Sequence, residues 1–337
     1  MPKTIRNVYD KAVSFEALLE AHYKARKGKR EKKNIILTEL TLEQNLLELE
    51  QKLKTGTYRH GSYKIFKIYE PKEREIMAAS YLDRIVHQWY VENFIKPYFV
   101  PQFICTTYAC IKGKGMHKAA KDVQFAMRKA KAKWKEYYIL KMDVTKYFKN
   151  IDKRILWDIL KRKIKDRKLL WLTREILLSS SSLVGLPIGN YTSQMFANIY
   201  LNEVDQYAKH QLKCNYYFRY MDDIVILCEN KQIAKTWLNE ISCFLEKHLK
   251  LTLNSKTRIF KDKQGVNFCG YQIHENRLRI RPSSKKRMKR KLKKYTTLLK
   301  KGKMGLSDIQ KSIAGWLGYV VHADSYGLRK SMFYIEG

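Results

Sequence analysis

Three aspartates, Asp143, Asp222 and Asp223, are the residues of this sequence best placed to take part in catalysis. Asp143 closes a hydrophobic segment, and the other two are adjacent between two further hydrophobic segments. Turn chemistry explains one aspartate, because its carboxylate accepts backbone hydrogen bonds, but a second adjacent carboxylate repels the first. A divalent cation removes that repulsion, and Mg²⁺ favours sites with few carboxylates and phosphate oxygens. The pattern therefore indicates two-metal phosphoryl transfer.

Short strands must position these carboxylates. Apolar residues alternate along 138–144, which predicts a strand whose second face ends in Asp143. The β-rich runs 216–220 and 224–228 flank Met221-Asp222, which predicts a hairpin with acids at its tip. Other strands are expected within 57–76, with a turn at Glu70-Pro71, and at 251–253, 257–261, 266–273 and 278–281. Helices are expected at about 78–95, 152–178, 192–211 and 231–248.

Composition indicates a folded protein with a polyanionic partner. The chain has 337 residues, of which 45% are hydrophobic, and 68 Lys and Arg against 32 Asp and Glu give a net charge of +36. This hydrophobic content excludes a largely disordered chain, and the length predicts two domains or one domain with several lobes. Nucleic acid is the expected partner of such a charge, and an anionic membrane surface or a ribosome would also fit the charge alone. The first residues carry no secretory signal and no apolar run is long enough to span a bilayer, so we expect no membrane association and a cytoplasmic location.

The basic residues are concentrated in the C-terminal part. Residues 277–303 contain 14 Lys and Arg and no acid, yet Met288, Leu292, Tyr295 and Leu299 form an apolar stripe at helical spacing. This pattern predicts an amphipathic helix with a basic face, followed by a second helix near 309–320. Near the N-terminus, Ser14 is a predicted helix cap, and 41–44 reads as a capping box.

The aspartate motifs resemble those of reverse transcriptases. Residues 218–223 (FRYMDD) resemble the YxDD hairpin, and 141–148 (KMDVTKYF) resemble the first catalytic motif. Residues 69–74, 83–86, 107–110 and 114–117 also follow the family, so the resemblance extends from about residue 5 to 330. Residues 185–194 (GLPIGNYTSQ) resemble the IGxxxSQ signature of reverse transcriptases from diversity-generating retroelements, with Ile188 where most other reverse transcriptases have Gln.

This resemblance implies an α+β fold, the right-hand polymerase of fingers, palm with an antiparallel sheet, and helical thumb. The implied division is a basic helical segment at 1–56, fingers at 57–136, palm at 137–276 with a fingers insertion near 150–190, and thumb at 277–337. The implied activity is error-prone RNA-dependent DNA synthesis with two Mg²⁺ ions, which copies a template-repeat RNA into cDNA and so diversifies a target gene.

The resemblance also assigns roles to individual residues. Asp143, Asp222 and Asp223 are the implied catalytic and metal-binding acids, with the Val144 carbonyl as a further ligand. Phe148 is the implied steric gate against a ribose 2′-OH, and Ile188 is expected against the nascent base pair. The full implied sets are nucleotide binding by Lys72, Arg74, Phe148, Ile188, Gln194 and Lys256, primer grip by Phe268 and Gly270, and nucleic-acid binding by Lys285, Lys286, Arg287, Lys289, Arg290 and Lys293.

The expected partners are the structured template-repeat RNA, the RNA–DNA hybrid, dNTPs and the helical, oligomeric accessory variability protein of the retroelement. A bacterial, archaeal or phage origin is implied. A group II intron-like or retron-type reverse transcriptase is the nearest alternative. The alternative from another functional class is a non-catalytic RNA-binding or chaperone protein. Such a protein would not need Asp143 or Asp222.

Overall fold

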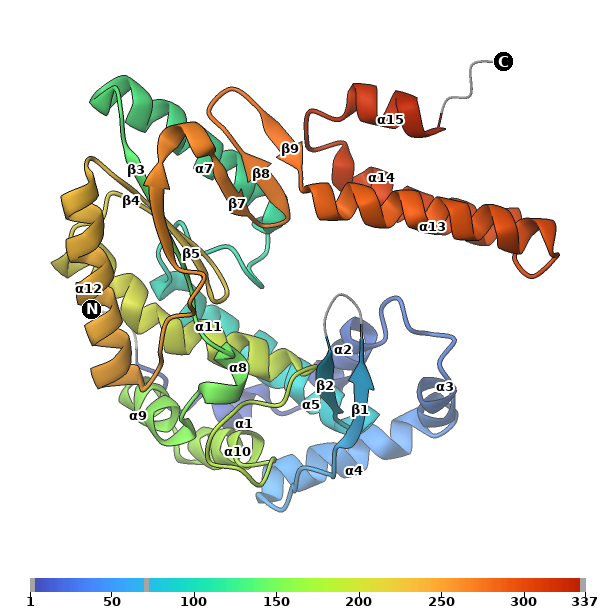
Figure 1. The fold of residues 1–337 in the computed structure, drawn as a ribbon. Coiled ribbons are helices and arrows are strands. Elements are labelled where there is room, and N and C mark those ends of the chain that lie inside the picture. The colour runs from blue at the N-terminus through green and yellow to red at the C-terminus, as the bar shows by residue number, and fades with distance from the viewer. Residues whose placement is uncertain (1–3, 70–72, 334–337) are drawn as a thin grey trace. The chain divides into compact units, whose positions relative to one another are not determined.

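The computed structural model describes residues 4–69 and 73–333, which form two compact units interleaved along the sequence (Figure 1). The first unit comprises Met1–Cys105, Val144–Leu212 and Glu240–Asn254, and the second comprises Thr106–Asp143, Lys213–Asn239 and Ser255–Gly337, as far as these ranges are described. Helix α12 (Lys231–Leu249) contributes to both units. The predicted mixture of helices with antiparallel sheets is confirmed.

The first unit is mainly helical. Its core forms where α2 packs against α4 and α5, and α11 packs against α5 and α9. The helices of this unit are α1 (Tyr9–Ala12), α2 (Phe15–Ala25), α3 (Lys33–Leu40), α4 (Leu42–Thr55), α5 (Tyr81–Tyr90), the π-helix η1 (Val91–Ile95), α6 (Lys96–Phe99), η2 (Val100–Gln102), α8 (Tyr147–Asn150), α9 (Lys153–Lys163), α10 (Arg167–Leu177), α11 (Tyr191–Gln206) and the π-helix η3 (Tyr207–Gln211). The strands β1 (Lys64–Ile68) and β2 (Arg74–Ala78) pair as an antiparallel hairpin. The predicted turn at Glu70-Pro71 lies outside the described residues.

The two predicted helix caps have different outcomes. Ser14 caps α2, since its hydroxyl accepts a hydrogen bond from the Ala17 amide at 3.2 Å. The capping box at 41–44 is wrong: Thr41 precedes α4 but makes no side-chain cap. Helix α3 ends directly before Thr41, and the Thr41 hydroxyl instead accepts from the Asn45 side-chain amide at 2.9 Å.

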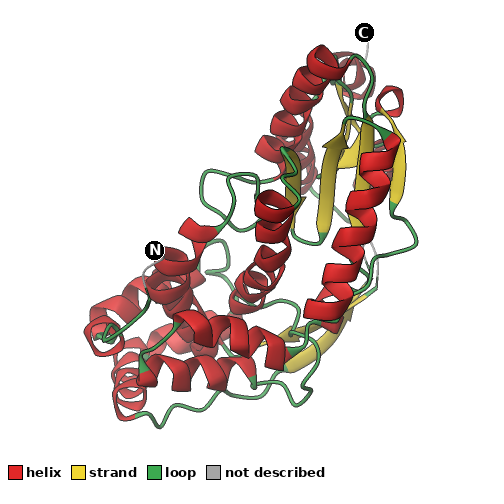
Figure 2. Ribbon diagram, turned by 90° about the vertical axis from the view of Figure 1, so that its left-hand side faces the viewer, coloured by secondary structure: helices red, strands yellow, loops and turns green. Residues whose placement is uncertain are grey.

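The second unit contains a four-stranded antiparallel sheet in the order β4-β5-β3-β6 (Figure 2). Its strands are β3 (Tyr138–Asp143), β4 (Tyr216–Tyr220), β5 (Asp223–Cys228) and β6 (Arg258–Lys261). Helix α7 (Met116–Trp134) lies against one face, where Ile139, Val225 and Leu227 join its apolar residues in one buried cluster. A strand at 251–253 is wrong: Leu253 forms only an isolated bridge with Val144 before the chain turns at 255–256.

A three-stranded sheet and three helices complete the second unit. The sheet consists of β7 (Val266–Phe268), β8 (Tyr271–Ile273) and β9 (Leu278–Ile280), preceded by the short helix η4 (Asp262–Gln264). Helix α13 (Pro282–Lys300) starts only after β9 and is followed by α14 (Leu306–Val320) and α15 (Tyr326–Phe333). The predicted apolar stripe of α13 is confirmed in part: Met288 and Tyr295 are buried and Leu292 is half-buried, whereas Leu299 is exposed.

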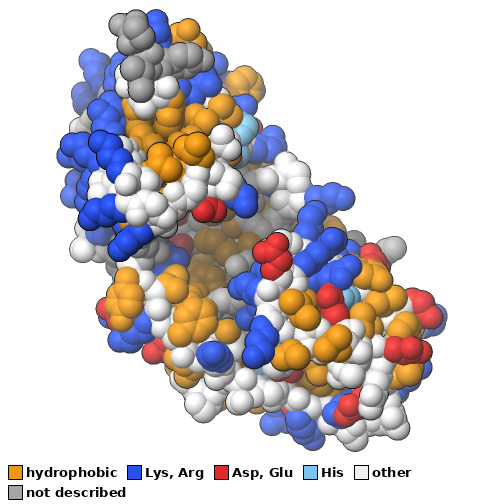
Figure 3. Space-filling view, turned by 90° about the vertical axis from the view of Figure 1, so that its right-hand side faces the viewer, with side chains coloured by type: hydrophobic (Ala, Val, Ile, Leu, Met, Phe, Trp, Pro, Cys, Tyr) orange, Lys and Arg blue, Asp and Glu red, His pale blue; other side chains and the backbone are white. Residues whose placement is uncertain are grey.

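The surface of the C-terminal helices is strongly basic. Figure 3 shows Lys and Arg side chains as a band on the upper part of the molecule, where α13–α15 lie. The α13 residues predicted to bind nucleic acid are all exposed: Lys285, Lys286, Arg287, Lys289, Arg290 and Lys293. Within residues 4–69 and 73–333, no helix combines the length and hydropathy needed to cross a bilayer.

Candidate active site

The three predicted aspartates lie at one end of the four-stranded sheet. The antiparallel register of β3 and β5 places Asp143 directly opposite Asp223. Residues paired in this way project their side chains from the same face, so these two carboxylates are neighbours. Asp222 precedes Asp223 in the turn between β4 and β5. The structure therefore brings together the acids that the sequence separates.

The turn that carries Asp222 has an unusual backbone. Tyr220 pairs with Asp223, which leaves Met221 and Asp222 as a two-residue turn. Met221 has φ 54°, and a positive φ at the first turn position is normally left to glycine. Such a conformation costs about 1 kcal/mol or more and persists only where its surroundings hold it.

Arg219 supplies that support. It is fully buried, and its Nη1 donates a hydrogen bond to the Met221 carbonyl at 3.1 Å. Its own amide and carbonyl are bonded to the backbone of Thr106 and Tyr108. Arg219 was not among the predicted site residues, although it is a lone charge inside a predicted hydrophobic strand.

Lys141 lies on the same face of β3 as Asp143 and was also missed as a site residue. Its ammonium forms an ion pair with Asp223 and lies 5.2 Å from the centre of the Phe268 ring. Burial is the main cause that lowers the pKa of Lys141 to about 7; the charge of Asp143 opposes this shift, and the charge of Arg281 contributes to it. Lys141 thus contacts both the Phe268 ring of the hydrophobic cluster and the Asp223 carboxylate.

A cleft of about 870 Å³ opens at these carboxylates, within the second unit. Asp143, Asp223 and Lys141 line it together with three further basic side chains, Lys256, Arg258 and Arg281. The predicted nucleotide-binding residue Lys256 is thus in the same cleft as two of the predicted acids. Opposed carboxylates beside several cations suit a phosphate-bearing substrate that reacts at a metal.

The oxygen donors of this site fit Mg²⁺. Asp143, Asp222 and Asp223 supply carboxylates, and the Val144 carbonyl is adjacent in the chain. Over the described part of the chain, no three His, Cys, Asp or Glu side chains form a ready-made metal cage. Mg²⁺ does not require one, because it is commonly held by one or two carboxylates, with waters and substrate phosphates completing its shell.

The segment 185–190 is hydrogen-bonded to α8 and β2, the two elements of the first unit that carry Phe148 and Arg74. The Leu186 amide donates to the Phe148 carbonyl at 2.8 Å, and the Met77 amide of β2 donates to the Ile188 carbonyl at 3.0 Å. Gly189 has φ 115°, and a Cβ there would lie 3.0 Å from the Ile76 side chain. The segment is therefore fixed between α8 and β2, with Phe148 and Ile188 partly exposed.

The other predicted nucleotide-binding residues vary in position. Arg74 is exposed on β2, and Gln194 is exposed in the first turn of α11. Lys256 lies in the second unit, whereas Arg74, Phe148, Ile188 and Gln194 lie in the first. Lys72 falls outside the described residues.

The predicted primer-grip residues lie at a second two-residue turn: Phe268 ends β7, and Gly270 is a turn residue. Phe268 pairs with Tyr271, and the turn residues Cys269 and Gly270 have φ 49° and 86°. Two positive φ values are typical of a type I′ hairpin turn. The Tyr319 hydroxyl of α14 donates to the Gly270 carbonyl at 2.5 Å. This contact joins the turn to the C-terminal helices.

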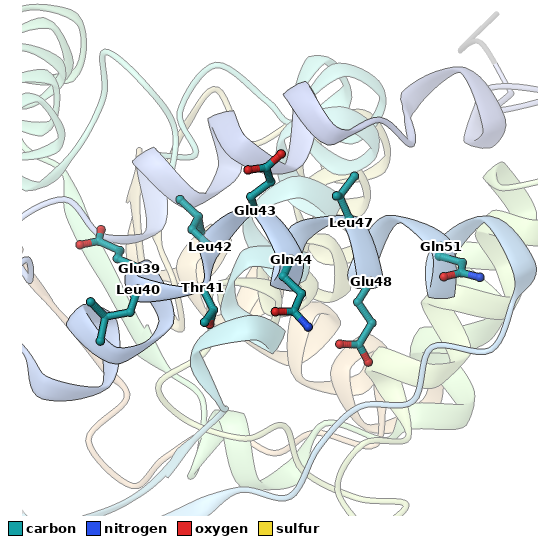
Figure 4. Close-up of a pocket in the computed structure, with 9 residues that line it drawn as sticks. All are labelled: Glu39, Leu40, Thr41, Leu42, Glu43, Gln44, Leu47, Glu48 and Gln51. Carbon is teal, nitrogen blue, oxygen red and sulfur yellow. The ribbon is translucent and has the colours of Figure 1, made fainter.

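Another hollow, of about 810 Å³, lies over α3 and α4 (Figure 4). Its side chains diverge: Glu43 and Leu47 point to one side of α4, whereas Gln44 and Glu48 point to the other. Its lining contains leucines and glutamates but no Lys or Arg. Divergent side chains cannot act on one atom, so the cleft at the aspartates is the candidate active site.

Comparison with known proteins agrees with this geometry. Residues 70–273 match the family model described as "Reverse transcriptase (RNA-dependent DNA polymerase)". The chain belongs to the reverse transcriptase family. The matched domain indicates RNA-directed DNA polymerase activity, which confirms the predicted enzyme class, and this family typically uses divalent metal ions such as Mg²⁺.

Several relatives share part of this chain. Protein YkfC of Escherichia coli is 24% identical over 261 residues, covering 63% of this chain and 67% of that protein. The group II intron-encoded protein LtrA of Lactococcus lactis is 23% identical over 328 residues, covering 75% of this chain. Only 53% of LtrA is matched, so this reverse transcriptase spans about half the length of that relative.

The fold is shared with a telomerase structure. Apo telomerase from Candida tropicalis, truncated from its C-terminal domain, superposes with a TM-score of 0.50 at 12% identity. The likeness covers 65% of this chain and 55% of the telomerase chain. At this identity the likeness shows the reverse transcriptase fold alone, which was the predicted fold class.

Proposed function

We propose that this reverse transcriptase is the mutagenic enzyme of a diversity-generating retroelement, which copies a template-repeat RNA into error-prone cDNA. The observation that carries the proposal is Ile188 within 185–194, the segment that resembles the signature of that subclass. A glutamine side chain at this position can hydrogen-bond an incoming nucleotide, whereas isoleucine offers only shape. Polar contacts give the larger rejection factors, so their loss weakens discrimination between correct and incorrect base pairs.

The chemistry we propose is attack of a primer 3′-OH on the α-phosphate of a dNTP, which forms a phosphodiester bond, breaks the bond between the α- and β-phosphates and releases pyrophosphate. Asp143 and Asp222 would hold two Mg²⁺ ions, with the Val144 carbonyl as a further ligand and Asp223 beside them. When bound, the ions lower the pKa of the attacking hydroxyl and stabilise charge on the displaced phosphate. Lys141 fixes Asp223 through their ion pair and so holds that carboxylate in place.

The remaining predicted residues would select and hold the substrates. Phe148 would exclude a ribose 2′-OH by occupying its space. Arg74, Lys72 and Lys256 would neutralise the triphosphate, and Arg suits bidentate phosphate contact. Ile188 and Gln194 would lie along the nascent base pair and template.

The proposed partners are the template-repeat RNA, its RNA–DNA hybrid and the accessory variability protein. The Phe268–Gly270 turn would contact the primer backbone. The exposed basic residues of α13 would hold the hybrid through phosphate contacts, which carry affinity without sequence information.

Mg²⁺-dependent primer extension tests the enzyme activity. The full chain should extend a DNA primer on an RNA template, and Asp222→Ala should abolish incorporation while leaving RNA binding within about twofold, because Asp222 makes no phosphate contact of its own. Full activity of Asp222→Ala would refute the assigned chemistry. RNA binding by a wild-type chain that never extends a primer would favour a non-catalytic RNA-binding or chaperone protein.

Sequencing cDNA made on a defined RNA template tests the mutagenic role. The resemblance to the diversity-generating subclass implies that errors concentrate at template adenines. Ile188→Gln should lower their frequency about tenfold or more, since it introduces a polar side chain that can hydrogen-bond the incoming nucleotide. Leu183→Gln is the matched control: it makes a similar apolar-to-amide change at an exposed position near the same segment. Errors spread evenly over all four template bases would contradict the proposal.

A group II intron-like reverse transcriptase is the second candidate, because LtrA matches 75% of this chain. An enzyme of this type should copy RNA accurately, and Ile188→Gln should leave its error frequency unchanged. A retron-type enzyme makes the same fidelity prediction. The sequenced cDNA therefore separates the mutagenic subclass from both alternatives.

A further inference from the structure

Arg281 lies in the cleft but outside the predicted catalytic, nucleotide-binding and primer-grip residues. It follows β9, precedes Pro282 at the start of α13, and lines the same cleft as Asp143 and Asp223. Its backbone is well anchored, because the Ser284 amide donates to the Arg281 carbonyl at 3.0 Å. The guanidinium is therefore carried on a fixed base beside the predicted acids.

The guanidinium of Arg281 lacks an anionic partner within the described protein. Its Nε is shielded from solvent and donates no hydrogen bond to any described residue. No carboxylate of the described residues lies within ion-pair distance of Arg281, and Asp223 is already paired with Lys141. A shielded, unpaired donor on a permanent cation is costly, so this position favours an anion supplied from outside the chain.

Neighbouring charges strengthen this argument. Lys141, Lys256 and Arg258 line the same cleft as Arg281. Cations placed together repel one another unless a polyanion lies between them. A guanidinium binds phosphate in a bidentate manner, which also fixes its orientation.

We propose that Arg281 binds a phosphate group in the cleft and positions it against the carboxylates Asp143 and Asp223. This inference rests on the proposed nucleotidyl transfer and deepens it. The phosphate has two possible sources: the last phosphodiester of the primer or the triphosphate of the incoming dNTP. Arg281 is thus a positioning residue for one of the two reactants.

Two substitutions and one control test the assignment in the full chain. Arg281→Gln removes the charge, and Arg281→Lys keeps the charge but loses the bidentate geometry. Arg279→Gln is the matched control, since Arg279 is exposed on β9, two residues before Arg281, and does not line the cleft. The measurements are the Kd for a primer–template hybrid by fluorescence anisotropy without Mg²⁺ or dNTP, and the KM for dNTP and kcat in primer extension.

The two phosphate sources predict different results. If Arg281 holds the primer, Arg281→Gln raises the hybrid Kd about tenfold and lowers the salt dependence of binding by about one phosphate contact, with the KM for dNTP unchanged. If it holds the triphosphate, the KM rises about tenfold and the hybrid Kd is unchanged. Arg281→Lys should recover part of either loss.

An Arg281→Gln variant that matches Arg279→Gln in both the hybrid Kd and the KM overturns the proposal. A loss of both together with a lowered thermal midpoint, and no recovery in Arg281→Lys, indicates a structural role and overturns it as well. The binding measurement needs no catalysis. A chain that binds hybrid through Arg281 but never extends a primer would refute the proposed function and leave this assignment standing.

Discussion

Two hairpin turns of the second unit have a similar backbone arrangement but differ in the residue at their second position. Met221-Asp222 joins β4 to β5, and Cys269-Gly270 joins β7 to β8. In both, the first residue has a positive φ without being glycine, with φ 54° at Met221 and 49° at Cys269. In both, a side chain from outside the turn donates a hydrogen bond to a turn carbonyl.

The second residue of each turn reveals the difference. The first turn has Asp222, a side chain that can bind a metal, whereas the second has Gly270, which leaves its backbone accessible. Support differs accordingly: fully buried Arg219 lies under the first turn, and Tyr319 reaches the second from α14. The acidic turn is built into the sheet core, while the glycine turn depends on the C-terminal helices.

Converting the first turn into the second should have the largest effect. Asp222→Gly keeps a two-residue turn, so the free energy of unfolding should change by less than about 1 kcal/mol. Incorporation should fall about 10³-fold, because a metal ligand worth several kcal/mol of transition-state stabilisation is lost. Primer extension and urea unfolding measure the two quantities. A large loss of stability would show that Asp222 also supports the turn.

Removing Arg219, whose side chain donates to the Met221 carbonyl of the acidic turn, should have the second largest effect. Arg219→Met leaves the Met221 carbonyl without its buried donor, and we expect a loss of about 3 kcal/mol in the free energy of unfolding. Primer extension should fall about tenfold, because the aspartates lose their fixed geometry. Arg277→Met, at an exposed position, is the control and should change stability by less than about 0.5 kcal/mol. Equal stability of the two variants would contradict this role of Arg219.

The parts of this site that could be predicted from sequence are local. The hairpin at 216–228 and the apolar stripe of α13 each depend on residues close together in the chain, so their periodicity was informative. The capping box at 41–44 failed because α3 ends directly before it, which a four-residue pattern cannot show.

The missed residues depend on register between distant segments. The ion pair of Lys141 with Asp223 exists because β3 pairs with β5 in one particular register, which a single sequence does not disclose. Burial of Arg219 likewise requires the 106–108 segment to lie beside β4. Tyr319 reaches Gly270 only after α14 has packed near β8.

The glycine turn should respond to bulk more than to charge. Gly270→Ala places a Cβ 2.8 Å from the Tyr319 hydroxyl at φ 86°, so the free energy of unfolding should fall by about 2 kcal/mol. Tyr319→Phe removes one hydrogen bond and should cost about 1 kcal/mol. Because phenylalanine also removes the clashing oxygen, the double variant should lose less than the sum of the single losses. If the losses in unfolding free energy, measured with urea, are additive, the turn and α14 contribute to stability independently.

The smallest effects should come from relieving the backbone of each turn. Met221→Gly and Cys269→Gly remove a strained positive φ worth about 1 kcal/mol, but glycine destabilises the folded state through entropy by a similar amount. Stability should therefore stay within about 0.5 kcal/mol of the parent in both variants. Primer extension should fall severalfold in Met221→Gly, because the freed turn no longer holds Asp222 rigidly, and less in Cys269→Gly, since Tyr319 still restrains its turn. Equal losses of primer extension in the two variants would mean that the rigidity of both turns matters equally to the reaction. That result would contradict the view that the first turn acts through the Asp222 side chain and the second through its backbone.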